Sequence, residues 1–270
     1  MTESPNDDRP IGLFDSGIGG LTVLKSLWSA LPQESFIYLG DTARLPYGSK
    51  SAQTIERYCL QNIDFLLKRG VKAIVVACNT ASTVLLDRKS EFSVPVYNVI
   101  EPGAQAAVKA SRTQQIGVLG TKATIAAKSY VRAIHRLDAT ATVFQQACPL
   151  LVPLVEEGWE DDPLTNLVIY RYLQPLLQAG VDTLILGCTH YPALHQGIAK
   201  VAGPNVQLVD SSQAIAKLIL EDFASGRLKP SAKRRHTDFF TTDVATSFLD
   251  VARRLMAPHE VPDLVAVDIT

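Results

Sequence analysis

Two cysteines end look-alike apolar segments of this chain. Cys78 follows AIVVA at residues 73–77, Cys188 follows TLILG at residues 183–187, and polar residues come directly after each thiol. The surrounding stretches, 70–80 and 180–190, align at an offset of 110 residues. A thiolate can abstract a proton and a thiol can return one. Two cysteines held on opposite sides of a ligand could therefore act as a base and an acid.

Both thiols are predicted to lie near helix N-termini, because helices are expected to open at Ala81 and Ala193. A helix N-terminus lowers the pKa of a nearby thiol. The alternative is that both are small buried core residues, as free cysteines often are. Their duplicated position at strand ends favours function. None of the four cysteines forms a CxxC pair, so we expect reduced thiols and neither a disulfide framework nor a metal site.

A third polar strand end is the stretch Asp15-Ser16, which is followed by glycines up to Gly20. The spacing does not fit the G-x-G-x-x-G fingerprint of dinucleotide loops. We expect the glycines to provide positive φ and close backbone approach, with N–H groups left for a carboxylate. Asp15 could hold an ammonium group, tune a thiol or simply cap a helix.

Further polar groups lie near the same strand ends. His190 could orient or protonate the Cys188 thiol, or be a hydrogen-bonded bystander. Glu156 and Glu157 have the pattern of an exposed pair on a helix. The uncharged hydrogen-bonding groups together suit a small polar ligand. They are Asn79, Thr80, Thr121, Thr189 and the turn Pro46-Tyr47-Gly48.

Short β-branched runs alternate with amphipathic stretches along the whole chain, a pattern that predicts the α/β class with mostly parallel sheets. In the predicted helix 51–69, Ile55, Cys59, Ile63 and Leu66 share one face, which places Cys59 in the core. The predicted strands are IGLF from Ile11, FIYLG from Phe36, AIVVA from Ala73, VYNVI from Val96, IGVLG from Ile116, TVFQQ from Thr142, TLILG from Thr183, VQLVD from Val206 and DFFTT from Asp238.

The duplication extends beyond the cysteines. Residues 11–16 align with 116–121, and 99–103 with 208–212, so that Glu101 corresponds to Asp210. Three matches in the same order imply two related, doubly wound halves, joined near Glu101 and again near Asp210. Ligands of such sheets bind beyond the carboxyl ends of the strands, so we expect a cleft between the halves with one thiol on each side.

Composition narrows the class of protein. With 270 residues, 47% hydrophobic, 20% charged and a net charge of −1, the chain is expected to be soluble and globular, without nucleic acid as its partner. The basic run 233–235 is interpreted as a solvated loop. The polar first ten residues are interpreted as a frayed tail with no signal peptide. No apolar run approaches the roughly 20 residues of a membrane span, so a cytoplasmic protein is expected.

Several motifs, in the same order, resemble those of the glutamate racemases, cofactor-independent enzymes that make D-glutamate for bacterial peptidoglycan. They span nearly the whole chain. The motifs are FDSGIGGLTVL from Phe14, GDTARLPYGSKS from Gly40, ACNTAS from Ala77, VIEPG from Val99, PLLVPLVEEG from Pro149 and GCTHYP from Gly187.

The resemblance implies that Cys78 and Cys188 are the catalytic acid/base pair and that no cofactor is needed. Asp15, His190 and one of two adjacent glutamates, Glu156 in preference to Glu157, are implied as auxiliary ionisable groups. It also implies a homodimer. Substrate-binding roles are implied for Asp15, Ser16, Tyr47, Gly48, Asn79, Thr80, Thr121, Thr189 and His190.

The family's fold implies that one α/β domain comprises residues 1–101 and 210–270, and the other residues 102–209. The polar extension before Ile11 is short. Regulation of the kind that longer-tailed relatives apply through such an extension therefore stays open for this chain.

Three other functions are alternatives. An aspartate or hydantoin racemase would share the paired cysteines but need a pocket of another size, and the sequence THYP after Cys188 is more similar to the glutamate enzymes. A two-lobed small-ligand binder would not need strand-end thiols. A thiol redox protein would be expected to carry CxxC.

Overall fold

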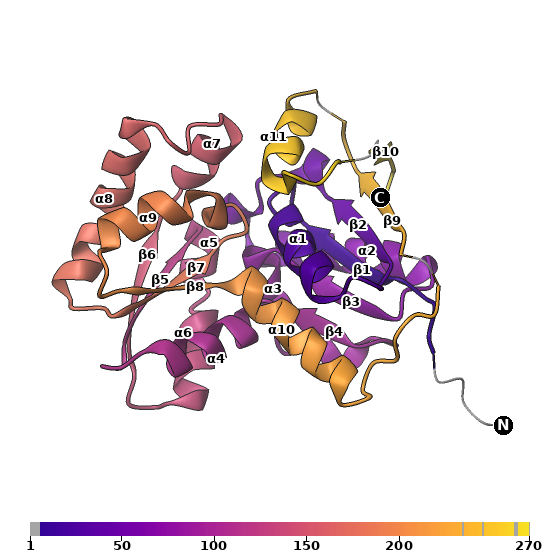
Figure 1. The fold of residues 1–270 in the computed structure, drawn as a ribbon, viewed down its shortest axis with the longest axis horizontal. Helices are drawn as coiled ribbons and strands as arrows, with labels where there is room; N and C mark the ends of the chain where they lie inside the picture. The colour runs from indigo at the N-terminus through magenta and orange to yellow at the C-terminus, as the bar shows by residue number, and fades with distance from the viewer. Residues whose placement is uncertain (1–5, 234, 245, 262–263, 270) are drawn as a thin grey trace.

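Two parallel sheets lie side by side in the computed structural model, which describes residues 6–233, 235–244, 246–261 and 264–269 (Figure 1). The first sheet has the strand order β10-β9-β2-β1-β3-β4 and the second β6-β5-β7-β8. The predicted α/β class is confirmed. The strands are β1 Ile11–Asp15, β2 Phe36–Gly40, β3 Ala73–Val76, β4 Val96–Asn98, β5 Gln115–Gly120, β6 Thr142–Ala147, β7 Thr183–Gly187, β8 Gln207–Asp210, β9 Thr237–Thr241 and β10 Val265–Ala266.

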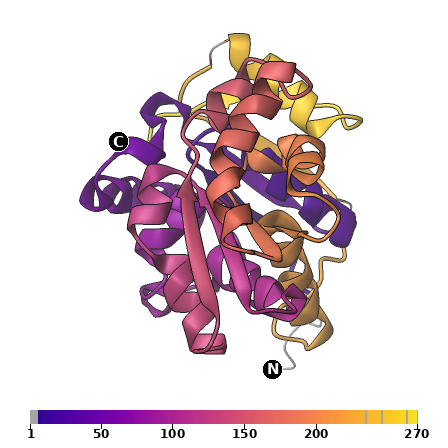
Figure 2. The same cartoon turned by 90° about the vertical axis from the view of Figure 1, so that its left-hand side faces the viewer.

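Helices connect successive strands and lie on both faces of each sheet (Figures 1 and 2). The α-helices are α1 Leu21–Ala30, α2 Ala52–Lys68, α3 Asn79–Leu85, α4 Ile100–Ala110, α5 Lys122–Ala126, α6 Ser129–Leu137, α7 Leu151–Glu156, α8 Pro163–Gln178, α9 His195–Ala202, α10 Ser211–Ala224 and α11 Thr246–Met256. The 3₁₀ helices are η1 Thr42–Arg44, η2 Tyr47–Ser49, η3 Lys89–Glu91 and η4 Tyr191–Leu194.

Local sequence signals account for individual helices. Ser51 caps α2, because its side-chain oxygen accepts a hydrogen bond from the N–H of Thr54. Cys59 is fully buried on the inner face of that helix, as predicted. Asp162 caps α8 in the same way, and Pro163 occupies its first turn, where its missing N–H costs nothing.

Apolar side chains from both faces of each sheet form the core. On one face of the first sheet, β1 and β3 pack against α1, α10 and α11, and this cluster continues to α8 and α9 against β7 of the second sheet. The opposite faces are covered by α2 and α3 in the first sheet and by α4 and α6 in the second. A shared core therefore fixes the two sheets relative to each other.

The strand register tests the internal repeat. Ile11 pairs with Ala73 and Ile116 pairs with Thr183, so the first two predicted matches are confirmed. The third match was wrong. Val76 pairs with Asn98, and its counterpart Leu186 pairs with Asp210.

The residue equivalent to Asp210 is therefore Asn98, and not Glu101, which lies in the first turn of α4. The side chain of Asn98 accepts hydrogen bonds from the N–H groups of Ile100 and Glu101, as that of Asp210 does from Ser212. Strand β4 ends at Asn98, whose side chain binds the first two N–H groups of α4. The predicted strand from Val96 was therefore two residues too long, because residues 99 and 100 are not part of it.

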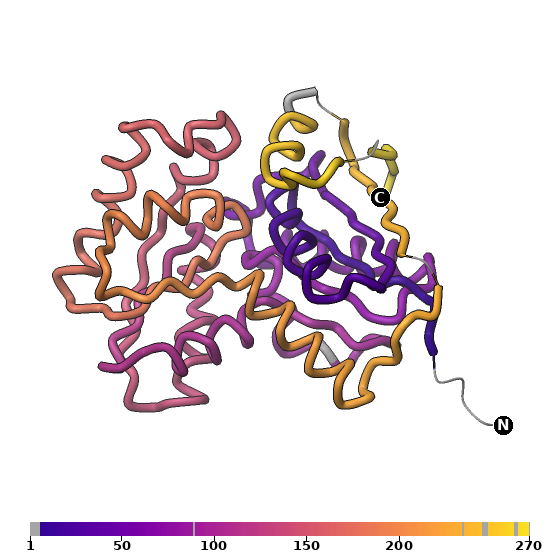
Figure 3. The backbone as a smooth tube through the Cα atoms, in the orientation of Figure 1, coloured from indigo at the N-terminus to yellow at the C-terminus, as the bar shows by residue number. Residues whose placement is uncertain are grey.

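The chain crosses between the two sheets twice, after β4 and after β8, and its last segment returns beside the first (Figure 3). β9 pairs with β2 and β10 with β9, which extends the first sheet to six strands. The assignment of residues 1–101 with 210–270 to one domain and 102–209 to the other stays a prediction.

The predicted frayed tail was wrong for the part of it that the structure describes. The N–H of Asp7 donates to the carbonyl of Pro230, and the buried Lys72 donates through Nζ to the carbonyl of Asp7. Residues 1–5, and Arg234 of the predicted basic loop, lie outside the described residues. Among the helices that the structure describes, none is long and apolar enough to cross a membrane.

Candidate active site

A cavity of about 360 Å³ lies where the carboxyl ends of the two sheets meet, and both Cys78 and Cys188 line it. Cys78 follows β3 of the first sheet and Cys188 follows β7 of the second. Among the predicted site residues, the others that line it are Ser16, Tyr47, Gly48, Asn79, Thr80, Thr121, Glu156, Thr189 and His190.

Cys78 is the N-cap of α3, which begins at Asn79, two residues earlier than predicted. Its thiol lies 3.5 Å from Ser16 Oγ and accepts a hydrogen bond from the N–H of Ala81 at 3.4 Å. Burial, with the Asp15 carboxylate adding to it, raises the pKa of Cys78 to about 12, although the contacts with Ser16 and Ala81 oppose the rise. The predicted lowering of the pKa was therefore wrong for this thiol, because desolvation exceeds the effect of a short helix.

Cys188 has other neighbours. The predicted helix at Ala193 was wrong, because the 3₁₀ helix η4 comes first and α9 begins only at His195. Cys188 Sγ lies 3.9 Å from His190 Nδ1. His190 Nε2 lies 3.3 Å from Glu156 Oε1, a charge contact without the alignment of a hydrogen bond.

Burial would lower the pKa of His190, but the contacts with Cys188 and Glu156 outweigh it and raise the pKa to about 10. The imidazole is thus cationic at neutral pH. Glu156 rather than Glu157 meets the histidine, and Glu157 faces a separate hollow beside Asp243. Of the two adjacent glutamates, only Glu156 lines the cavity of the thiols.

Asp15 lies behind the cavity wall and is fully buried at the end of β1. Its carboxylate accepts a hydrogen bond from the N–H of Gly17 at 3.0 Å and lies 3.4 Å from Thr189 Oγ1. Burial raises its pKa, against the opposing charge of His190. When ionised, Asp15 opposes ionisation of Cys78, and it lies beside Thr189 on the side of Cys188.

The glycines after Asp15 do not adopt positive φ, contrary to the prediction, but close approach explains them. A Cβ on Gly19 would lie 2.3 Å from Thr189 Oγ1 and 2.5 Å from His190 Nδ1. A side chain at this position would thus separate the first sheet from the loop that carries Cys188.

The segment after β2 forms the rim of the cavity. Tyr47 lines it, yet its hydroxyl points to buried Asp41, to which it donates a hydrogen bond, and it accepts one from Asn62. Tyr47 therefore contributes ring and backbone to the cavity. A Cβ on Gly48 would lie 2.7 Å from Thr121 Cβ, so this turn also needs glycine for close packing.

Asn79 and Thr80 connect the two sheets as well as lining the cavity. Tyr130 donates to Asn79 Oδ1 at 2.6 Å, and the hydroxyls of Thr80 and Thr121 lie 2.9 Å apart. Thr121 also caps α5 by accepting from the N–H of Thr124.

Comparison with known proteins agrees with this geometry. Residues 20–219 match the Asp/Glu/Hydantoin racemase family. A glutamate racemase from Geobacter metallireducens is 47% identical over 250 residues, covering 92% of this chain and 93% of that protein. This chain belongs to the Asp/Glu/Hydantoin racemase family. It is an amino-acid racemase, an enzyme of the isomerase class.

Solved structures of family members share the whole fold of this racemase. A glutamate racemase isoform from Bacillus anthracis has a TM-score of 0.92 at 38% identity, covering 96% of this chain and 97% of that one. The Francisella tularensis glutamate racemase, solved in complex with D-glutamate, has a TM-score of 0.90 at 37% identity, covering 97% and 98%.

The structure adds residues to this racemase site that the sequence patterns did not single out. Val152 and the prolines of the motif PLLVPLVEEG form an apolar wall, and Lys122 brings a cation to the cavity. In the sequence, the motif PLLVPLVEEG was the signal that could have identified this apolar wall. The signal for Lys122 is its place directly after Thr121, just beyond the end of β5. The lining residues for which the sequence analysis predicted no site role are Gly17, Leu45, Ser49, Lys122, Pro149, Val152 and Pro153.

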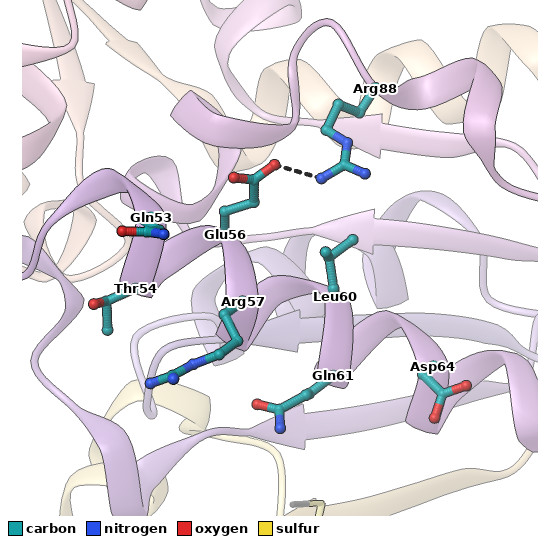
Figure 4. A pocket seen from close by; sticks show the side chains of 8 residues that line it. All are labelled: Gln53, Thr54, Glu56, Arg57, Leu60, Gln61, Asp64 and Arg88. Carbon is teal, nitrogen blue, oxygen red and sulfur yellow. Dashed lines mark hydrogen bonds and ion pairs between the residues drawn. The ribbon is translucent and has the colours of Figure 1, made fainter.

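A larger hollow of about 770 Å³ lies along α2, and neither Cys78 nor Cys188 lines it (Figure 4). The Glu56 carboxylate and the Arg88 guanidinium form an ion pair there. None of the predicted site residues lines this hollow. The smaller cavity, which Cys78 and Cys188 both line, is therefore the candidate active site.

Proposed function

We propose that this racemase interconverts L-glutamate and D-glutamate with Cys78 and Cys188 as its two acid/base groups, without a cofactor. The observation that carries the proposal is that both thiols line one cavity, each from the equivalent strand end of a different sheet. Racemisation removes the α-proton from one face of the substrate and adds a proton to the other, which needs a base and an acid on opposite sides.

The two thiols must be in unlike ionisation states for each turnover. The pKa of about 12 keeps Cys78 protonated at neutral pH. The cationic His190, 3.9 Å from Cys188, stabilises negative charge on that sulfur. If Cys188 faces the α-proton of L-glutamate, as in the family, the reaction from L-glutamate uses Cys188 as the base and the Cys78 thiol as the acid. The states exchange after each turnover.

The remaining groups serve the substrate and the carbanion. Ser16, Asn79, Thr80, Thr121 and Thr189 offer hydroxyl and amide groups to two carboxylates and an ammonium group. Tyr47 and Gly48 close the rim. Asp15 sets the charge near both thiols, and Glu156 keeps His190 cationic. The complex of the Francisella enzyme with D-glutamate supports glutamate as the ligand of this cavity.

The decisive experiment follows L-glutamate in deuterated water without added cofactor. A two-thiol enzyme should form D-glutamate that carries deuterium at the α-carbon from the first turnovers, while the remaining L-glutamate stays largely protiated. Early D-glutamate rich in protium, measured by mass spectrometry, would refute two separate bases. Racemisation of L-aspartate in preference to L-glutamate would show that aspartate is the substrate instead of glutamate.

In the cell, the product would supply D-glutamate for peptidoglycan, from a cytoplasmic homodimer. Leu164, Leu167 and Tyr170 support self-association, since they are exposed at helical spacing on α8. Sedimentation velocity tests the dimer, and D-glutamate auxotrophy after gene deletion tests the cellular role.

A further inference from the structure

The C-terminal helix α11 reaches from the first sheet to the second through Arg254. One guanidinium nitrogen, Nη2, donates to the carbonyls of Val155 and Glu156, each at 2.9 Å. Arg254 Nε also lies 3.8 Å from a carboxylate oxygen of Glu160. The last turn of α7 is thereby held by a residue about 100 positions further along the chain.

The turn after α7 is shaped to receive this guanidinium. Gly158 has a φ of +76°, and a Cβ built on it would lie 3.1 Å from Arg254 Cζ. A side chain here would be strained by the backbone conformation and would also press on the guanidinium. Arg254 and Gly158 therefore fit together as one contact between α11 and α7.

Arg254 binds the same residue, Glu156, that faces His190 in the cavity. Glu156 offers its carbonyl to Arg254 and its carboxylate to His190, which in turn lies beside Cys188. Since α7 has only six residues, its last turn has little rigidity of its own. We propose that Arg254 is a positioning residue for the Cys188 half of the reaction, because it holds Glu156 in place against His190.

This inference rests on the proposed two-thiol function, and it predicts an effect on one thiol only. Cys78 contacts Ser16, in the loop between β1 and α1, and Ala81 in α3. Neither residue is part of the series of contacts that leads from Arg254 through Glu156 and His190 to Cys188. Loss of Arg254 should raise the barrier for proton transfer at Cys188 and leave the one at Cys78 unchanged.

Rates alone cannot show this asymmetry. The two enantiomers have equal free energies, so kcat/KM must be the same in both directions for any variant. The isotope effect on kcat/KM differs, because it reports how far each proton transfer limits the rate. α-Deuterated L-glutamate probes the transfer at Cys188, and α-deuterated D-glutamate probes the transfer at Cys78.

The test compares Arg254→Gln with Arg253→Gln, which changes the neighbouring arginine of α11 that pairs with exposed Asp250. For Arg254→Gln we expect kcat/KM to fall about tenfold, less than the 10²–10⁴-fold that an acid/base group itself contributes. Its isotope effect should rise with labelled L-glutamate and fall with labelled D-glutamate. Arg254→Lys should restore part of the rate, and Arg253→Gln should match the wild type.

A second readout needs no activity. The charged and titratable groups around His190 are Cys188, Glu156 and Asp15. Loosening Glu156 should lower the titration midpoint of His190, measured by NMR of ¹³C-labelled histidine, in Arg254→Gln and not in Arg253→Gln. An unmoved midpoint, or equal changes of both isotope effects, would overturn the positioning role. If the wild-type enzyme did not exchange the α-proton of glutamate, the proposed function would be refuted. The titration of His190 in Arg254→Gln would still show whether Arg254 holds Glu156 against His190.

Discussion

The two halves of the molecule place a thiol at the same strand end and then surround it differently. Cys78 starts an α-helix and contacts Ser16, and the Asp15 carboxylate nearby adds to the rise of its pKa. Cys188 is followed by a 3₁₀ helix and has the cationic His190 beside it. Both are almost fully buried, so exposure does not distinguish them.

The difference shows which part of the site each level of structure controls. The repeated strand order fixes where the sulfur atoms lie, because equivalent strands end at the shared cleft. The charge on each sulfur depends on the loop that follows and on neighbours from other elements. Duplication alone would give two equal thiols, whereas the proposed mechanism needs one thiolate and one thiol.

Removing either thiol should have the largest effect. Cys78→Ser and Cys188→Ser are each expected to lower racemisation by about 10²–10⁴-fold in both directions, because an acid and a base are both required. Cys78→Ser should still exchange the α-proton of L-glutamate slowly, and Cys188→Ser that of D-glutamate. Proton NMR in deuterated water measures both. Equal losses in the buried controls Cys59→Ser and Cys148→Ser would point to folding instead.

A methyl group on Gly19 should damage the Cys188 side selectively. The new Cβ would lie within 2.5 Å of Thr189 and His190 side chains, so the loop after Cys188 must move. We expect Gly19→Ala to lower kcat/KM by at least about tenfold, and the isotope effect with α-deuterated L-glutamate to rise. Gly197→Ala in α9 is the matched control, since its Cβ would meet only the flexible side chains of Ile169 and Asn166. A fully active Gly19→Ala enzyme would contradict the close packing.

The pH profile of kcat/KM should be bell-shaped, because one thiolate and one thiol must coexist. Its alkaline limb should begin near pH 10, where His190 loses its proton, before Cys78 ionises near pH 12. In His190→Asn the acidic limb should shift to higher pH, since the positive charge that favours a thiolate is gone. A profile that rises to a plateau through alkaline pH would contradict the requirement for one thiolate and one thiol.

The smallest expected effect is on stability. The pKa of His190 is raised from 6.5 to about 10 on folding, so its contribution is complete below pH 6.5 and is lost as the pH rises through 10. Between pH 7 and pH 9 the free energy of unfolding should fall by about 2 kcal/mol more in the wild type than in His190→Asn. Urea denaturation measures it. The window ends at pH 9 because the raised pKa of Cys78 also makes the free energy of unfolding fall with rising pH, but only above about pH 9. Parallel curves for the two proteins would show that His190 is not charged.

Much of the fold could be predicted from the sequence. Nine strands were placed within one or two residues at most ends, because buried strands are short β-branched runs with clear limits. The short β10, with two exposed residues, carries no such signal and was missed. The placement of both thiols in one cavity also agrees with the predicted repeat, whereas the catalytic roles of the site residues stay predictions.

The errors share a physical cause. The repeat was extended to Glu101 because it resembles Asp210 in type, but hydrogen bonds of the helix start select Asn98. The glycines after Asp15 were expected to need positive φ, but what requires them is the approach of Thr189 and His190 from 170 residues away. No local pattern contains either fact.

By itself, the sequence determined the α/β class, the duplicated strands and the position of a thiol at the end of each, because these follow from local apolar runs and their spacing. Only the tertiary structure decided which charged groups surround each thiol. Burial raises the pKa of Cys78, His190 brings a cation to Cys188, and Arg254 holds Glu156 from the far end of the chain. Desolvation and charge act over a few ångströms in space, whatever the separation along the chain.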